Sequence, residues 1–238
     1  KNPSGESADD DHPAARNQLR KPITAMDDAQ QGSADHADTD FNYIRRRGRF
    51  TKAQATALAA LTERYRWTAD DLQMRPLGME IGFGMGLELI DWAQQRPNWL
   101  LLGVELYQPG IGSMLSRLDK NELGNVRLVD QPAQLLLEEL ADYCLAEVRI
   151  FFPDPWPKKR HHKRRLIQPE FLQQLYRRVQ IGGIVRLATD WAEYAEWMVE
   201  HFAEHPGFEL VSDNIRGTQE QPSSSMVAQE VRRTTKFE

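Results

Sequence analysis

The chain has 238 residues, of which 40% are hydrophobic, and this is enough for one α/β domain with its own core. Its single cysteine, Cys144, excludes an intramolecular disulfide framework and a cysteine-based zinc cluster. The longest apolar run, which starts near Trp99, is far shorter than the roughly 20 residues of a membrane helix. No basic-then-apolar leader is seen, so we expect a soluble cytoplasmic protein with no membrane partner.

The formal net charge of −5 comes from the first 40 residues, which hold nine acids and four bases. They contain few large apolar side chains, so we expect a disordered acidic tail at 1–40 and one folded domain at 41–238. That domain carries 26 charges of each sign. Its bases cluster in an N-terminal arm (Arg45, Arg46, Arg47, Arg49 and Lys52) and in a basic tract at 158–165, which is the pattern that local phosphate binding requires.

Apolar runs and helical periodicities alternate from residue 51 onward. A helix is expected at 51–66, with Thr51 as its N-cap. Strands are expected at 77–81, 99–106, 126–130, 148–152, 184–188 and 208–212, and helices between them up to about 96, at 108–121, around 135–140, at 169–179 and at 191–205. This alternation predicts a Rossmann-like domain, with a mostly parallel sheet flanked by helices and ligands at the carboxyl ends of the strands.

Three glycines, Gly82, Gly84 and Gly86, follow the first strand in what we call the glycine loop. Their G-x-G-x-G spacing differs from the G-x-G-x-x-G of dinucleotide-binding folds. Glu80 stands at the strand end, where a carboxylate repels a pyrophosphate but attracts the sulfonium and ammonium groups of S-adenosylmethionine. Glu105 ends the second strand, where a carboxylate can accept both ribose hydroxyls.

A second motif, FFPDPW at 151–156, holds Asp154 between two prolines after an apolar strand. Each proline pushes the residue before it toward extended backbone, so Phe152 and Asp154 are expected in a stiff loop. We call residues 153–156 the Asp154 loop. Trp156 either packs against the protein or stacks on a base, and the sequence leaves both open. An acid, an aromatic ring and a basic tract in succession suggest a polyanion that carries a flat base.

The basic tract contains six Lys or Arg and two His within 158–165. Such side chains bind phosphates without selecting a sequence. Histidines within a basic run contact phosphate or solvent more often than they bind a metal, so no metal is expected. The predicted RNA contacts are Arg160, His161, His162, Lys163, Arg164 and Arg165.

Four segments resemble the bacterial tRNA (guanine-N7-)-methyltransferases: 79–86, 151–156 with Lys158 and the basic run after it, 188–191, and 235–238. The resemblance implies that the chain methylates N7 of a guanine in the variable loop of tRNA, with S-adenosylmethionine as cofactor and tRNA as partner. It implies that Asp154 is the active-site acid. The expected cofactor contacts are Glu80, Gly82, Gly84, Gly86, Glu105, Pro132 and Asp154, and the expected substrate contacts are Lys158, Asp190, Thr235, Lys236, Phe237 and Glu238.

The chain departs from that family in two places. The acid that follows the third strand in the family aligns with Pro132, and Asp130 on the same strand face is the alternative. The last strand of the family's sheet is expected to be missing, which would leave an unpaired edge.

Guanine N7 carries a lone pair and no proton, so methyl transfer needs alignment rather than a general base. Asp154 is expected to accept hydrogen bonds from N1 and N2 of the guanine and to stabilise the growing positive charge, a task that Asp190 could share. The alternatives are a non-catalytic RNA-binding relative, a nicotinamide-dependent dehydrogenase, and a methyltransferase for a protein or a small molecule. The sequence leaves open the oligomeric state and the tRNA species.

Overall fold

The computed structural model describes residues 48–68, 71, 76–216 and 226–233, which belong to one unit at Phe41–Glu238. Several predictions made from the sequence therefore fall outside the described residues: the acidic tail at 1–40, the arginines at 45–47, and the substrate contacts at 235–238.

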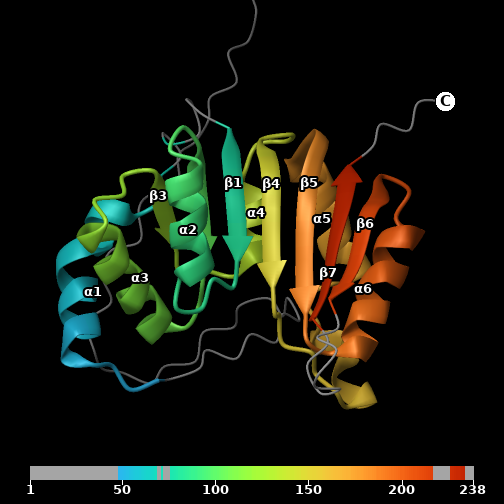
Figure 1. The fold of residues 1–238 in the computed structure, drawn as a ribbon, viewed down its shortest axis with the longest axis horizontal. Coiled ribbons are helices and arrows are strands. Elements are labelled where there is room, and N and C mark those ends of the chain that lie inside the picture. Colours follow the sequence, from blue (N-terminus) through green and yellow to red (C-terminus); the bar gives the residue numbers. More distant parts are fainter. Residues whose placement is uncertain (1–47, 69–70, 72–75, 217–225, 234–238) are drawn as a thin grey trace, which may run out of the picture. The chain divides into compact units, whose positions relative to one another are not determined.

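The described residues form one seven-stranded sheet in the order β3-β2-β1-β4-β5-β7-β6 (Figure 1). The strands are β1 (Leu77–Ile81), β2 (Leu100–Val104), β3 (Val126–Val129), β4 (Leu145–Phe151), β5 (Val179–Thr189), β6 (Phe208–Arg216) and β7 (Met226–Arg233). The first five pair in parallel, so their carboxyl ends share one edge, the lower one in Figure 1. This confirms the predicted Rossmann-like class.

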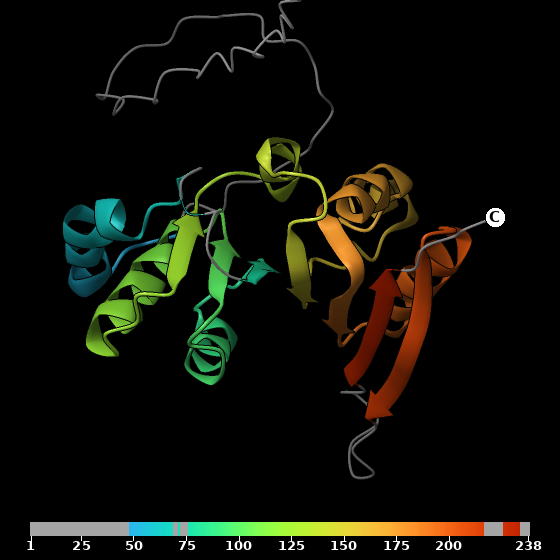
Figure 2. The same cartoon turned by 90° about the horizontal axis from the view of Figure 1, so that it is seen from above.

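Helices cover both faces of the sheet, as the view from above shows (Figure 2). They are α1 (Lys52–Tyr65), α2 (Leu87–Gln95), α3 (Gln108–Lys120), α4 (Ala133–Glu139), α5 (Pro169–Arg178) and α6 (Ala192–Glu204), with a short 3₁₀ helix, η2, at Lys159–Arg164. Apolar side chains of α1, α2 and α3 form one core, and those of α4, α5 and α6 form the other. The result is the three-layer arrangement that places ligands at the carboxyl edge.

The central strands β1 and β2 are buried at every position. Parallel strands covered on both faces require near-continuous apolar sequence, which is why LGMEI and LLLGV could be recognised from the sequence. Helix α1 begins as predicted: the Thr51 hydroxyl accepts from the Gln54 amide at 3.2 Å, and the Gln54 side chain accepts from the Thr51 amide at 2.8 Å. This reciprocal capping box fixes the start of the helix.

The expectation that the last strand is missing is wrong. Strand β7 inserts between β5 and β6 and pairs antiparallel with both, so β5 has no unpaired edge. Its sequence, MVAQEVRR, mixes charged and apolar residues and lacks the clean period-two pattern by which a strand is recognised. The partner β6 is also longer than predicted, since it extends to Arg216.

Candidate active site

The glycine loop turns the chain from β1 into α2. Gly82, Gly84 and Gly86 all have positive φ angles, of 77°, 55° and 81°, which residues other than glycine rarely adopt. A Cβ added at Gly82 or Gly84 would meet nothing within 4 Å, whereas at Gly86 it would lie 2.3 Å from Met114 Sδ. The first two glycines therefore border open space where a ligand can approach the backbone, and the third serves the packing of α2 against α3.

This difference gives a stability prediction for two matched variants. Gly86→Ala combines a strained φ with overpacking against Met114 and should destabilise the protein by about 2–4 kcal/mol. Gly82→Ala has the strain alone and should lower stability by about 1–2 kcal/mol. Urea unfolding of both variants measures the difference, and equal losses would contradict the packing role of Gly86.

Glu80 is buried at the carboxyl end of β1, with 3% of its surface exposed. Its Oε2 atom is buried without a hydrogen-bond partner among the described residues. Burial raises the pKa of this carboxyl to about 7, and the positive charge of Arg149 on β4 only partly offsets the effect. A buried acceptor without a partner is costly, so Glu80 fits a ligand that brings a cationic nitrogen.

Glu105 directly follows β2 and faces the glycine loop. Its Oε2 accepts from the Gly84 amide at 2.8 Å, and its Oε1 accepts from the Leu106 and Tyr107 amides at 2.7 and 2.9 Å. These three bonds fix the orientation of the carboxylate. Because two carboxylate oxygens offer about four lone-pair sites, capacity remains for a ligand hydroxyl.

The segment after β3 holds Pro132, one of the expected cofactor contacts, and Asp130, the alternative to it. Pro132 is the N-cap residue of α4 and makes no side-chain hydrogen bond there. Asp130 lies just beyond β3, and its Oδ2 accepts a hydrogen bond from the Gln108 side chain at the start of α3. Asp130 therefore stands between the carboxyl ends of β2 and β3, on the same edge as Glu80 and Glu105.

The Asp154 loop leaves β4 with a strained backbone. Phe152 and Trp156 have φ angles of 52° and 44°, so the extended conformation expected for Phe152 is not found. The Phe152 amide donates to the Ala188 carbonyl of β5 at 2.8 Å, which holds this residue despite the strain. Asp154 is exposed on the carboxyl edge, and Asp190 is exposed just after the neighbouring β5. The two predicted acids thus follow adjacent strands.

The basic tract forms η2 and divides into exposed and packed side chains. Lys158, Lys159, Arg160 and Lys163 are exposed. The Arg164 guanidinium lies 5.0 Å from the centre of the Trp156 ring, and the His161 ring meets Trp156 edge-on at 5.9 Å. These contacts favour the packing role of Trp156 over stacking on a base.

The prediction that Arg165 contacts RNA is wrong. Its side chain has 0% exposure, so it cannot reach an RNA phosphate from this position. Its Nε instead donates to the Pro155 carbonyl at 2.8 Å. Local sequence gave no signal for this role, because Arg165 ends a run of solvated bases and its partners Glu193, Tyr194 and Trp197 come from a distant helix.

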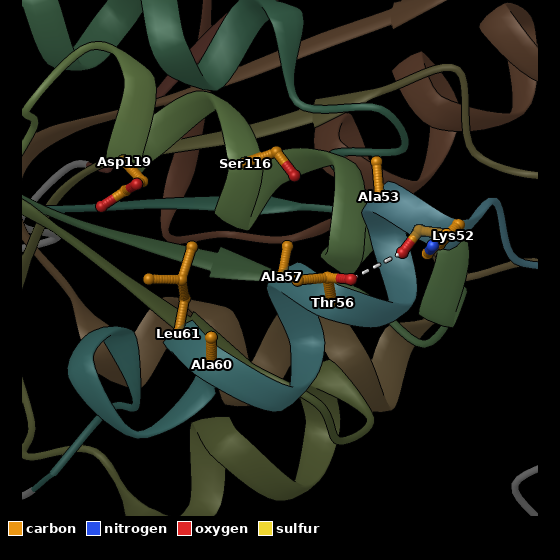
Figure 3. Close-up of a pocket in the computed structure, with 8 residues that line it drawn as sticks. All are labelled: Lys52, Ala53, Thr56, Ala57, Ala60, Leu61, Ser116 and Asp119. Atoms are coloured by element: carbon orange, nitrogen blue, oxygen red, sulfur yellow. Dashed lines mark hydrogen bonds between the residues drawn. The ribbon is translucent and has the colours of Figure 1, made fainter.

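A shallow groove lies between α1 and α3 (Figure 3). Small side chains line it, among them Ala53, Ala57 and Ala60 of α1 and Ser116 of α3. A Cβ at Gly112 of α3 would lie 2.8 Å from the Gln54 carbonyl, so the groove reflects the close approach of two helices. It does not bring together the acids and glycines described above.

Within the described part of the chain, no group of three or more His, Cys, Asp or Glu is arranged to hold a metal ion. None of the described helices is long and apolar enough to cross a membrane.

Comparison with known proteins identifies the family of this chain. A family model described as "Putative methyltransferase" matches residues 74–238. A tRNA (guanine-N(7)-)-methyltransferase of Nitrosococcus oceani is 43% identical over 191 residues, covering 75% of this chain and 80% of that protein. One of Marinobacter nauticus is 40% identical over 207 residues, covering 83% and 84%.

The fold has solved counterparts as well. An rRNA methylase from Streptococcus thermophilus superposes with a TM-score of 0.54 at 11% identity, covering 79% of this chain and all of that chain; this is a likeness of fold alone. Fold and family model together define a Rossmann-like methyltransferase. More narrowly, the chain belongs to the tRNA (guanine-N7-)-methyltransferase family. The dehydrogenase alternative has no support among these relatives.

Proposed function

We propose that this protein transfers a methyl group from S-adenosylmethionine to N7 of a guanine in the variable loop of tRNA, in the cytoplasm. The observation that carries the proposal is the grouping of Glu80, the glycine loop and Asp154 on one edge of the sheet in a chain of this family. In this view, residues 41–238 are the methyltransferase domain and residues 1–40 are an appended acidic tail.

The residues of the glycine-loop side fit the cofactor. Glu80 would accept hydrogen bonds from the cofactor's ammonium group and thereby satisfy its buried Oε2. Glu105, already oriented by three backbone amides, would accept from a ribose hydroxyl through its remaining lone pair. Gly82 and Gly84 leave room for the bound molecule. Bound there, S-adenosylmethionine supplies an electrophilic methyl group on a sulfonium.

At the adenine end of the cofactor site, Pro132 stands where the family has an acid. We infer that Pro132 contacts the cofactor only by van der Waals packing. Asp130 is then the acceptor for the adenine amine, and Gln108 helps to hold it. Gly86 acts indirectly, since its packing against Met114 sets the position of α2.

On the substrate side, Asp154 would accept hydrogen bonds from N1 and N2 of the guanine. This fixes the base so that the N7 lone pair points along the line of the methyl–sulfur bond, which is the main requirement for the transfer. As N7 acquires positive charge, the Asp154 carboxylate stabilises it. No proton leaves N7, so no general base is needed. Asp190, after the adjacent strand, would support the same base.

The exposed bases of η2 would bind the tRNA backbone. We assign this to Lys158, Arg160 and Lys163, with His161, His162 and Arg164 as partly buried contributors, and we leave Arg165 out because it is buried. The segment Thr235, Lys236, Phe237 and Glu238 lies outside the described residues and remains a proposed substrate contact from the family resemblance.

The basic helix gives a prediction about salt. Changing Lys158, Arg160 and Lys163 together to Gln should weaken tRNA binding and reduce the slope of log K against log salt by roughly two to three. Changing three exposed bases on the other side of the domain, Arg66, Arg96 and Lys120, should leave the slope unchanged. Filter binding at several salt concentrations measures both, and equal slopes for the two triple variants would contradict the assignment.

The position of the target is tested with tRNA transcripts. We expect labelled methyl transfer to a transcript with its natural variable loop, and loss of transfer when the guanines of that loop are replaced by adenine. Undiminished transfer to the substituted transcript would refute the variable-loop target while leaving the class of enzyme intact.

A further inference from the structure

Arg165 is the last residue of the basic tract, yet its side chain is fully buried. Among the described arginines that form ion pairs, it alone has a side-chain exposure of 0%. Its guanidinium carbon lies 5.0 Å from the centre of the Tyr194 ring and 4.8 Å from that of the Trp197 ring, and both rings belong to α6. A charge buried in this way persists only where specific partners hold it.

Its hydrogen bonds join two parts of the site. Nε donates to the carbonyl of Pro155, the residue after Asp154, at 2.8 Å, and Nη2 reaches Glu193 Oε1 at 3.3 Å. Glu193 lies in the first turn of α6, shortly after Asp190. Arg165 therefore connects the loop that carries one predicted substrate acid to the helix that follows the other.

The chain around Arg165 is fastened to the same helix. The Trp197 indole donates to the Ile167 carbonyl at 2.8 Å, and the Tyr194 hydroxyl accepts from the Ile167 amide at 3.4 Å. His162 Nε2 lies 3.4 Å from Glu193 Oε1. These contacts keep Arg165 fixed from the α6 side, so its remaining bond acts on the Asp154 loop.

That loop needs such support. Phe152, which precedes the loop, and Trp156, which ends it, adopt positive φ angles, a strained backbone that persists only when its surroundings hold it. Asp154 is carried by this loop and is itself exposed, so a movement of the loop backbone would also move its carboxylate.

We propose that Arg165 is a positioning residue for methyl transfer: it holds the Pro155 carbonyl against α6 and thereby sets Asp154 where the guanine must bind. The proposal rests on the proposed function for its catalytic consequence. Its structural content, that Arg165 restrains the Asp154 loop, does not depend on that function.

Arg178 offers a matched control for the loss of a buried arginine. It too is mostly buried, donates to a main-chain carbonyl (Leu137) and pairs with an acid (Asp142). It lies at the carboxyl end of α5, however, and makes neither of its bonds to the Asp154 loop. Arg178→Met should therefore reproduce the general destabilisation of losing a buried arginine without the effect on the site.

The test compares Arg165→Met, Arg165→Lys and Arg178→Met. For Arg165→Met we expect kcat to fall by about 100-fold, while KM for tRNA and the Kd for S-adenosylhomocysteine stay within about threefold. A lysine can reach either the Pro155 carbonyl or Glu193 but not both, so Arg165→Lys should give an intermediate kcat with a Tm close to that of the original protein. Arg178→Met should lower the Tm and leave kcat within about threefold.

Hydrogen exchange supplies a readout that does not require turnover. Amides in a peptide spanning 152–158 should exchange about tenfold faster in Arg165→Met than in Arg178→Met. An unaltered kcat or an unaltered exchange rate in both Arg165 variants would overturn the positioning role. If the original protein methylates no tRNA, the proposed function fails, and the exchange experiment still decides whether Arg165 restrains the loop.

Discussion

Replacement of Asp154 by alanine is expected to slow methyl transfer to tRNA severely while cofactor affinity stays nearly intact. The carboxylate is the one charged group of the Asp154 loop, and it would both orient the guanine and stabilise the positive charge that forms on it. Removal of a group that acts mainly in the transition state costs about 100- to 1,000-fold in rate. Because Glu80 and Glu105 lie at the carboxyl ends of other strands, the cofactor should still bind.

Two measurements separate these effects. Single-turnover transfer of labelled methyl groups gives the rate, and titration with S-adenosylhomocysteine gives the affinity. Asp154→Asn keeps the shape of the side chain without its charge and should be nearly as inactive as Asp154→Ala. As a control, Glu200→Ala removes an exposed acid of α6 and should leave both the rate and the affinity unchanged. Near-normal turnover of Asp154→Ala would remove Asp154 from the reaction.

Cofactor affinity is expected to depend on pH through Glu80. Burial raises the pKa of this carboxyl to about 7, and only its ionised form attracts the cofactor's ammonium group. Between about pH 6 and pH 8 the carboxyl loses its proton, so S-adenosylhomocysteine should bind about tenfold more tightly at the higher pH. Calorimetric titrations across this range measure the change.

Stability should respond with the opposite sign. The carboxyl of Glu80 has an ordinary pKa of 4.5 in the unfolded chain and a pKa of about 7 in the folded protein. Between these two pH values the folded state holds a proton that the unfolded state has lost. Stability of the cofactor-free protein therefore falls as pH rises from about 4.5 to 7 and is level above that range, as far as Glu80 is concerned.

The variant Glu80→Gln separates the two effects. It should lose the pH dependence of binding and bind more weakly at about pH 8, and its Tm relative to the original protein should be higher there than at about pH 5. A pH profile of binding that is the same in Glu80→Gln would show that another group titrates.

The parts of this protein that could be predicted are those with a local physical cause. Buried parallel strands such as β1 must be apolar throughout, Thr51 caps its own helix, and the glycine loop needs positive φ angles. Each of these requirements produces a recognisable pattern within a few consecutive residues. The acids at strand ends follow from the same logic, because a parallel sheet collects its carboxyl ends at one edge.

The parts that were missed depend on distant partners. Strand β7 is recognised by its pairing with β5 and β6 rather than by its own charged sequence. Arg165 looks like any other base of its tract until α6 supplies Glu193, Tyr194 and Trp197. Phe152 was expected to be extended, yet its bond to Ala188 accompanies the strained φ that is found.

The most direct test of the central claim is to incubate the protein with methyl-labelled S-adenosylmethionine and unmodified tRNA, digest the RNA, and identify the labelled nucleoside. We expect all label in 7-methylguanosine, which would establish the reaction and the acceptor atom together and show that Pro132 is tolerated. Label in another nucleoside, or none although S-adenosylhomocysteine still binds, would contradict the account and favour a relative that only binds RNA.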